Sequence, residues 1–363
     1  MSKALELFFE LLLISSGAKK SLSHSYSDIE WKGALFVAND QTITGVLTSA
    51  METIEDESTL PSKRVLLQWI GSDQIIERNT IKMKEYTDVV VDFFHRNGIA
   101  CQILKGVAVG RYYPQPNRRS AGDIDIWLDG GREKIYEFAR NFDKEGMLYG
   151  VNYHHIHFHL IKGVHVEAHI WPSFLSSPLR NLRFHKFCNL HRPTMERDMP
   201  SLAFDRVFIL LHCYRHMSGR GLGLRQVMDY FYVLKQGFSD DEKKDAVYWI
   251  KKLGMQRFAR GLMWVLQHYF GLEKQFLLMP PCENEGKFII REVLLTGNMG
   301  HGDIRNWGSI NSALSRFFRN LRRDIYLAGH YPHEALWQPF FSIWLYLWRM
   351  SHGLLVDRDM QDI

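Results

Sequence analysis

The hydrophobic and polar positions of this 363-residue chain divide it into three stretches. Residues 1–85 follow the 3.6-residue period of helices, beginning with an amphipathic apolar run over residues 4–14. Residues 86–172 alternate short β-rich runs with helical ones, which is typical of an α/β unit. Residues 173–363 return to a helical pattern that is rich in tryptophan and arginine. We therefore expect an α+β protein, with a small mixed-sheet core flanked by N-terminal helices and a larger C-terminal helical region.

The middle stretch can be assigned element by element. Its pattern predicts a helix over residues 86–95 that Gly98 ends, and a β-hairpin whose turn is Lys162-Gly163. The other predicted elements are a strand over 99–104, a short segment over 107–113, a strand over 123–128, a helix over 132–144 capped by Gly146, and the hairpin strands over 153–161 and 164–170.

Composition excludes several classes of protein. Hydrophobic residues make up 46% of the chain and charged residues 23%, which is too apolar for a disordered protein. A net charge of +5 is too small over this length to indicate nucleic-acid binding. The four cysteines form no CxxC pair, so we expect free thiols in a reducing compartment.

Neither end of the chain predicts export or membrane insertion. The run over residues 4–14 has no cationic leader or cleavage site. The aromatic run over residues 339–348 ends at Arg349 and is shorter than the ~20 apolar residues that span a bilayer. A buried helix is the preferred interpretation of this second run, with interfacial membrane contact as the alternative. We expect a cytoplasmic protein without stable membrane insertion.

The main candidate for chemistry is the run Gly122-Asp-Ile-Asp-Ile126. Residues two apart in a strand share a face, at a spacing of ~6.6–6.8 Å. Asp123 and Asp125 would therefore present paired carboxylates while Ile124 and Ile126 enter the core. Like charges persist side by side where a cation neutralises them, and hard oxygen ligands favour Mg²⁺. The alternative is a solvated strand face that carries two aspartates by chance.

Two further features accompany this pair. Glu167 faces away from the core of its own strand and adds a third carboxylate, which would complete a site for two metal ions. Lys105-Gly106 follows a predicted strand, where glycine permits close approach of the backbone to a phosphate and lysine adds a cation.

This succession of residues resembles the signature of the DNA polymerase β-like nucleotidyltransferase superfamily. Within it, five segments are similar to the bacterial family of uncharacterised nucleotidyltransferases. They are Leu104-Lys-Gly106, Arg119-Ser-Ala-Gly-Asp-Ile-Asp-Ile126, Val166-Glu-Ala-His169, His212-x-x-x-His216 and Gly223-Leu-Arg225-x-x-x-Asp229. Val107 departs from the superfamily, which usually has a second small residue at this position.

The resemblance implies a magnesium-dependent transferase that moves a nucleoside monophosphate from a nucleoside triphosphate to a hydroxyl-bearing acceptor and releases pyrophosphate. Two Mg²⁺ ions would be held by Asp123, Asp125 and Glu167. The implied nucleotide-binding residues are Lys105, Gly106, Arg119 and Ser120. A solvated loop is the alternative for Arg119. The acceptor stays open among a small molecule, a sugar, a protein and an RNA end, as does the base of the triphosphate.

We expect the acceptor side in the helical region. Residues 202–217 predict a largely buried helix on which His212 and His216 lie one turn apart, and Arg225 and Asp229 repeat this spacing on the next helix. The order Arg–Asp is unfavourable for an intrahelical ion pair, so both residues are expected to have other partners. These four residues and His169 are predicted to border the cleft; the alternative is that they only fill the core.

The 17 histidines favour a second hypothesis. His155, His157 and His159 share one face of a predicted strand, and His165 and His169 share a face with Glu167. A transition-metal hydrolase with Glu167 as general base would use such a set, although no HExxH motif occurs. A third hypothesis is an inactive nucleotide-binding or interaction module. The partner surface of such a module could include six tryptophans of the helical region. A core position is the preferred interpretation of these residues, which are Trp249, Trp264, Trp307, Trp337, Trp344 and Trp348.

Overall fold

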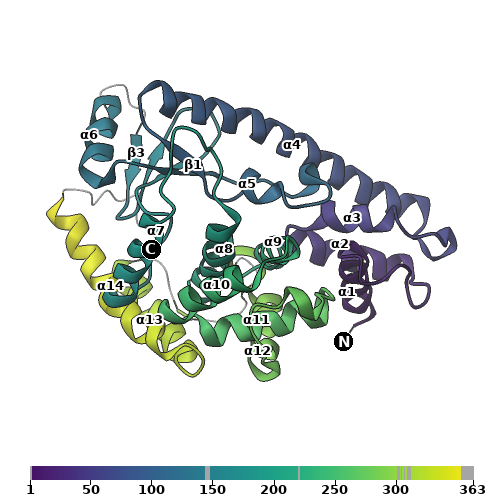
Figure 1. Ribbon diagram of the computed structural model, residues 1–363. Helices are drawn as coiled ribbons and strands as arrows, with labels where there is room; N and C mark the ends of the chain where they lie inside the picture. Colours follow the sequence, from purple (N-terminus) through teal and green to yellow (C-terminus); the bar gives the residue numbers. More distant parts are fainter. Residues whose placement is uncertain are drawn as a thin grey trace.

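The computed structural model describes residues 2–143, 148–219, 221–300, 303, 305, 307–308 and 312–352. Within these residues, one five-stranded mixed sheet is surrounded by helices that make up most of the chain (Figure 1). The predicted α+β class is therefore confirmed.

The N-terminal stretch forms a helical layer. Its elements are α1 (Lys3–Ser15), α2 (Asp28–Asp40), α3 (Thr44–Met51), a 3₁₀ turn (Glu57–Thr59) and α4 (Lys63–Arg96). Ser2 caps α1, and Ser27 with Glu30 forms a capping box that fixes the start of α2. The predicted helix over residues 4–14 is confirmed as α1.

The long helix α4 connects this layer to the sheet. Its 34 residues span about 51 Å, and in Figure 1 it runs along one side of the molecule from α3 to α6. Our prediction that a helix begins at residue 86 is wrong, because buried positions continue without a proline from Val65 and Trp69 to Val90 and Phe94. The boundary that we drew at residues 85 and 86 therefore lies inside α4. Gly98, with φ of +72°, follows the helix end as predicted.

The sheet has the strand order β1-β2-β5-β4-β3. Its strands are β1 (Cys101–Ile103), β2 (Ile124–Leu128), β3 (Leu148–Val151), β4 (His155–Phe158) and β5 (Val166–His169). Strands β2 and β5 are parallel and the other neighbours are antiparallel. The predicted strands over 99–104 and 123–128 are confirmed as β1 and β2, and the predicted hairpin is confirmed as β4 and β5. Strand β3 was missed, α6 (Gly131–Asp143) is confirmed, and its predicted cap Gly146 lies outside the described residues.

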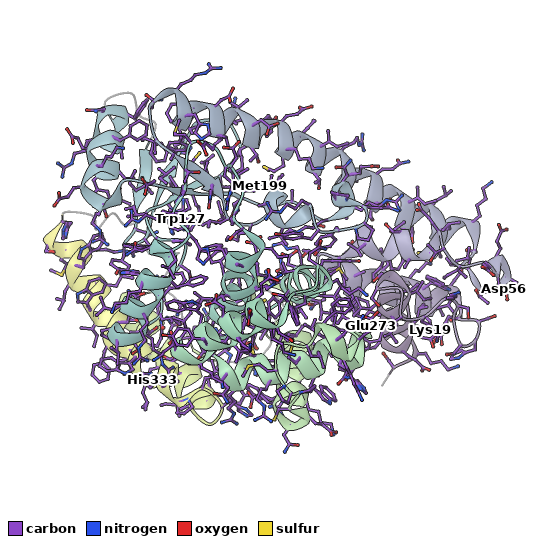
Figure 2. All side chains as sticks on the ribbon, viewed as in Figure 1. Lys19, Asp56, Trp127, Met199, Glu273 and His333 are labelled. Atoms are coloured by element: carbon purple, nitrogen blue, oxygen red, sulfur yellow. The ribbon has the colours of Figure 1, made fainter. Side chains whose placement is uncertain are left out.

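Two hydrophobic clusters hold the described residues together. One lies on a single face of the sheet, where Ile124 and Ile126 of β2 pack with Val90 and Phe94 of α4 and with α6. The other joins the N-terminal helices to the C-terminal ones and reaches the opposite face of the sheet through Trp127. Figure 2 shows Trp127 where the sheet meets the helices, and its ring stacks on Phe204 with centroids 5.6 Å apart. Alternation along β2 thus directs aspartates and isoleucines to different surroundings.

The C-terminal stretch is helical as predicted, apart from one isolated β-bridge. Its helices are α7 (Pro178–Asn189), α8 (Leu202–Ser218), α9 (Leu224–Lys235), α10 (Asp240–Lys252), α11 (Gln256–Tyr269), α12 (Glu283–Thr296), α13 (Ala313–Ala328) and α14 (Pro332–Ser351).

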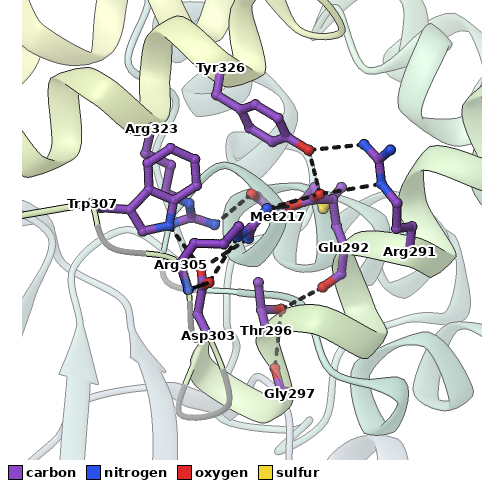
Figure 3. A network of polar contacts seen from close by, with 10 residues as sticks. All are labelled: Met217, Arg291, Glu292, Thr296, Gly297, Asp303, Arg305, Trp307, Arg323 and Tyr326. Carbon is purple, nitrogen blue, oxygen red and sulfur yellow. Dashed lines mark hydrogen bonds and ion pairs between the residues drawn. The ribbon is translucent and has the colours of Figure 1, made fainter.

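Buried polar contacts attach α13 to α12. Glu292 accepts hydrogen bonds from Tyr326 at 2.6 Å and from Arg305 at 2.9 and 3.1 Å (Figure 3). Arg323 donates to the carbonyl oxygen of Met217 at 3.1 Å, which also ties α13 to the end of α8. The bonds from Tyr326 and Arg305 satisfy the carboxylate of Glu292, which is buried away from water.

The terminal helix α14 corrects our preference for a buried aromatic helix. Phe340 is 65% exposed and Leu347 is 56% exposed, and Trp337 and Trp344 are exposed as well. Only one side of α14 packs on the protein, where Trp344 contacts Tyr153 edge-on at 5.0 Å. Among the described residues, no helix combines the length and apolarity needed to cross a bilayer.

Candidate functional site

A cleft of about 720 Å³ lies between the sheet and helices α8 and α9. Strands β2, β4 and β5 supply one wall, α8 and α9 supply the facing wall, and the loop after β5 closes one side. All three predicted carboxylates line this cleft, as do Lys105, Gly106, Arg119 and the five residues predicted for the acceptor side. The described residues that line it do not include Ser120.

The sheet register brings the carboxylates together. Asp125 of β2 and Glu167 of β5 are direct partners across the parallel strand pair, and Asp123 precedes β2 on the same face. The ammonium of Lys105 lies 2.8 Å from Asp125 Oδ1. The third carboxylate that we expected beside the aspartates therefore lies on the strand next to them.

Electrostatics in the cleft follow from this crowding. Burial raises the pKa of Asp123, and the charges of Asp125 and Glu167 raise it further. Burial opposes the charge on Lys105, but Asp125 and Glu167 outweigh it and raise the pKa of the ammonium. The carboxylates thus need cations around them, and the ammonium of Lys105 contacts Asp125.

His169 bridges two of the carboxylates. Its Nε2 lies 3.0 Å from Asp125 Oδ1 and 3.4 Å from Glu167 Oε2. Burial disfavours the imidazolium, yet these two contacts raise the pKa of His169 above its ordinary value. The contact with His169 also lowers the pKa of Glu167. Burial disfavours the charge on Glu167, but the hydrogen bond from His169 holds the pKa of Glu167 well below its ordinary value.

Other histidines extend the site along the sheet. His155 and His157 of β4 are buried and face the cleft, His165 lines the cleft but is exposed, and His159 is exposed and does not line it. His154, which the sequence did not single out, also lines the cleft and lies 3.0 Å from His155. Burial lowers the pKa of His155 to about 3 and that of His154 well below its ordinary value, so both rings are neutral.

Gly106 fixes the junction between β1 and the short helix α5 (Val107–Gly110). Its φ of +63° lies in the region that favours glycine, and a Cβ placed on it would be 3.7 Å from the carbonyl oxygen of Asp123. The backbone N–H of Leu104 donates to the carbonyl of Asp125 at 2.9 Å. This junction therefore sets Lys105 beside the aspartates.

Arg119 is not the solvated loop residue that we gave as its alternative. It lines the cleft, and its guanidinium also binds a carboxylate of the facing helix α9. It is 6% exposed, and its guanidinium donates to both carboxylate oxygens of Asp229. The hydroxyl of Tyr113 donates to the same carboxylate at 2.6 Å. Burial opposes the charge on Arg119, but Asp229 outweighs it and raises the pKa of the guanidinium. The prediction that Asp229 has a partner other than Arg225 is confirmed.

Arg225 is placed differently. It lines the cleft close to Gly122, and its one hydrogen bond among the described residues is a long one of 3.4 Å to the carbonyl of Ser120. Its Nε is buried without a hydrogen-bond partner, and no described carboxylate lies within ion-pair distance. Burial and the neighbouring Arg119 lower the pKa of Arg225. A half-buried guanidinium with no carboxylate partner within ion-pair distance among the described residues is able to pair with an anion.

The helical wall adds two imidazoles and an arginine. His212 and His216 contact each other edge-on at 4.4 Å, and burial keeps both rings neutral by lowering the pKa of His216 to about 3 and that of His212 well below its ordinary value. Arg215, which sequence reasoning missed, lies over the ring of Phe174 at 4.0 Å and pairs with Glu334 of α14 at 3.1 Å. No short motif marks Arg215, because its partners come from distant parts of the chain.

The donor set fits a hard divalent cation at the aspartates. Asp123, Asp125 and Glu167 supply carboxylate oxygens on one face of the sheet, and contacts with Lys105 and His169 relieve part of their mutual repulsion. Oxygen donors of this kind suit Mg²⁺.

The comparisons with known proteins agree with this chemistry. A family model described as "Uncharacterised nucleotidyltransferase" matches residues 27–271. The matched range contains every residue that lines the cleft. No curated protein matches the chain.

Proposed function

Since this chain belongs to the family of uncharacterised nucleotidyltransferases, we propose that it transfers a nucleoside monophosphate from a nucleoside triphosphate to a hydroxyl-bearing acceptor. The oxygen of the acceptor hydroxyl would attack the α-phosphorus, and the bond from that phosphorus to the bridging oxygen of the β-phosphate would break. Pyrophosphate would leave and the hydroxyl proton would be released.

One observation carries this proposal most strongly. Asp125 and Glu167 are register partners on parallel strands, with Asp123 two residues before Asp125 and Lys105 2.8 Å from it. Three carboxylates and one ammonium thus converge at the end of a large cleft. Such a set suits a triphosphate that arrives with its divalent cations.

Asp123, Asp125 and Glu167 would hold one or two Mg²⁺ ions. When bound, the ions would supply charge stabilisation to the attacking and leaving oxygens. His169 would orient Asp125 and Glu167, because its Nε2 contacts an oxygen of each.

Phosphate binding would fall to Lys105 and Arg225. Lys105 has a flexible stem and can turn from Asp125 to a phosphate oxygen, and Arg225 has no carboxylate partner among the described residues. Arg119 would instead position the wall of the site, since Asp229 takes two of its three hydrogen bonds and the carbonyl oxygen of Ser120 takes the third. This changes the role that we expected for Arg119 from phosphate contact to positioning.

The acceptor would enter from the helical wall. His212 and His216 are neutral there and can exchange hydrogen bonds with a hydroxyl group. Phe174, whose ring contacts Arg215 and stacks on Phe341, lines the same cleft. These residues would bind the acceptor near the α-phosphate without contacting the triphosphate itself.

Radioactive ATP distinguishes the proposed transfer from other phosphate chemistry. The full-length protein is incubated with Mg²⁺, a heat-treated cell extract as the source of acceptor, and ATP labelled at either the α- or the γ-phosphate. Transfer of the α label, with release of the γ label as pyrophosphate, is the expected result. Transfer of the γ label alone would identify a kinase and overturn the proposal. The variant Asp125→Asn is the matched control, because it keeps the shape of the side chain and removes its charge.

A further inference from the structure

The sheet places a row of imidazoles next to the carboxylates. Across the antiparallel pair of β4 and β5, His157 is the register partner of Glu167, and His155 is the partner of His169. On the other side of β5, the partner of Glu167 is Asp125. Glu167 therefore stands between an oxygen-rich half of the site and a nitrogen-rich half.

The nitrogen-rich half has the dimensions of a metal site. His155 Nε2 and His157 Nε2 lie 2.9 Å apart, and one donor atom each from His155, His157 and Glu167 lie within 4.8 Å of one another. With metal–nitrogen bonds of about 2.0–2.1 Å, two nitrogen ligands of a tetrahedral ion are about 3.3–3.4 Å apart. A shift of a few tenths of an ångström would let both rings bind one ion.

We propose that His155, His157 and Glu167 form a second cation site, for a divalent transition metal of the Zn²⁺ or Co²⁺ class. Imidazole nitrogen binds such ions in preference to Mg²⁺, whereas the aspartates beside it offer only oxygen. The site opens into the cleft, so water or a substrate oxygen can complete the coordination. This site shares Glu167 with the carboxylates of the proposed transferase site, but its metal binding can be measured without the transfer reaction.

The surroundings of His155 define what binding would change. Its Nδ1 lies 3.0 Å from His154 Nε2, a contact that orients the ring from outside the ligand set. The side-chain amide of Asn152 lies 2.9 Å from His155 Nε2. An ion and this amide cannot use the same lone pair, so metal binding displaces Asn152 from His155.

A neighbouring set of donors is the direct rival. One donor atom each from His154, His155 and His169 also lie within 4.8 Å of one another. That set has no carboxylate to offset the charge of a divalent cation, whereas the proposed set includes Glu167. Variants of His154 and His157 separate the two sets, because each residue belongs to only one of them.

Cobalt titration tests the proposal without nucleotide or turnover. The full-length protein, prepared without a histidine tag and freed of metal by chelation, is titrated with Co²⁺ in excess Mg²⁺ while its visible absorption is followed. We expect one Co²⁺ per chain with an absorption band of low coordination number. His157→Gln should weaken binding at least tenfold. His159→Gln, on the exposed continuation of the same strand, should leave it unchanged.

A ligand exchange keeps the test decisive where His157→Gln does not fold. His157→Cys should retain Co²⁺ and add a sulfur-to-cobalt charge-transfer band, because thiolate is also a ligand for these metals. The proposal is overturned if Co²⁺ does not bind in excess Mg²⁺. Undiminished Co²⁺ binding in His157→Gln would overturn it as well. Loss of Co²⁺ binding in His154→Gln alone would also overturn it, because that result assigns the ion to the rival set.

Discussion

The guanidinium of Arg119 donates two hydrogen bonds of 2.7 Å, one to each carboxylate oxygen of Asp229. Arg119 belongs to the loop that leads into β2, and Asp229 belongs to α9. The pair therefore fixes the strand that carries Asp125 relative to the helix that carries Arg225. Tyr113 adds a third hydrogen bond to Asp229, at 2.6 Å. The width of the cleft depends on this contact between its two walls.

Removing one partner of this pair is expected to destabilise the protein. Arg119→Ala leaves the buried Asp229 carboxylate without its cation, which typically costs about 3–5 kcal/mol of unfolding free energy. The double variant Arg119→Met with Asp229→Leu should cost less than either single change, because no buried charge is left unpaired. Urea unfolding of Arg119→Ala, of Arg119→Met, of Asp229→Leu and of the double variant measures these differences. Arg119→Ala with wild-type stability and lost nucleotide affinity would instead assign Arg119 to the phosphates.

Asp123, which directly precedes β2, and Asp125 within β2 are each expected to be essential for turnover. Asp123→Asn and Asp125→Asn remove one negative charge from the proposed cation site and should lower turnover by more than about 100-fold. The fold should survive, because the asparagine side chain has nearly the same shape. Initial rates of α-label transfer measure the effect, and circular dichroism checks the fold. Asp129→Asn, an exposed aspartate just beyond β2, is the control. Near wild-type rates in either Asp123→Asn or Asp125→Asn would contradict the proposed site.

The sequence carried more information about the sheet than about the helices around it. Strand β2 and the hairpin could be predicted because alternation along a strand and a Lys-Gly turn are local signals. The start of α4 was missed because a polar surface on a helix weakens the apolar period without ending the helix. Strand β3 was missed because it is a short edge strand that pairs only with β4.

The residues of the site also differ in how well their positions could be predicted from the sequence. Asp123, Asp125 and Glu167 could be assigned to strand faces that point away from the core because alternation along each strand is a local signal, whereas the direct register of Asp125 with Glu167 comes from the parallel pair of β2 and β5. The partner of Arg119 could not be predicted, since Asp229 is distant in sequence and only packing brings it close. The different surroundings of Arg119 and Arg225 are therefore visible only in the structure.

Arg225 is expected to bind the triphosphate of the nucleotide. Arg225→Gln should weaken ATP binding by roughly 10-fold or more, because a charge-assisted hydrogen bond contributes about 1.5–3 kcal/mol. Arg225→Lys should recover part of the affinity, since the charge returns without the planar fork of donors. Calorimetric titration with Mg²⁺–ATP and with tripolyphosphate measures both. Equal affinity of wild type and Arg225→Gln for tripolyphosphate would show that this guanidinium binds another group.

A buried carboxyl of α13 is expected to make the stability of the protein depend on pH. Asp324 of α13 is buried, and this burial raises its pKa from an ordinary 3.8 to about 7. The folded protein then holds a proton that the unfolded chain loses at lower pH. The contribution of Asp324 to stability is therefore complete below pH 4 and declines as pH rises through about 4 to 7.

Asparagine at this position isolates the effect, because it stays neutral at every pH. Compared with the wild type, Asp324→Asn should gain stability between pH 5 and pH 8, by up to about 1.4 kcal/mol for each unit by which folding raises the pKa. Urea unfolding of both proteins at these two pH values gives the difference. Asp241→Asn, on the exposed face of α10, should show no such gain. A difference between Asp324→Asn and wild type that does not change with pH would mean that Asp324 is already ionised in the folded protein at pH 5, with Arg323 as its compensating charge.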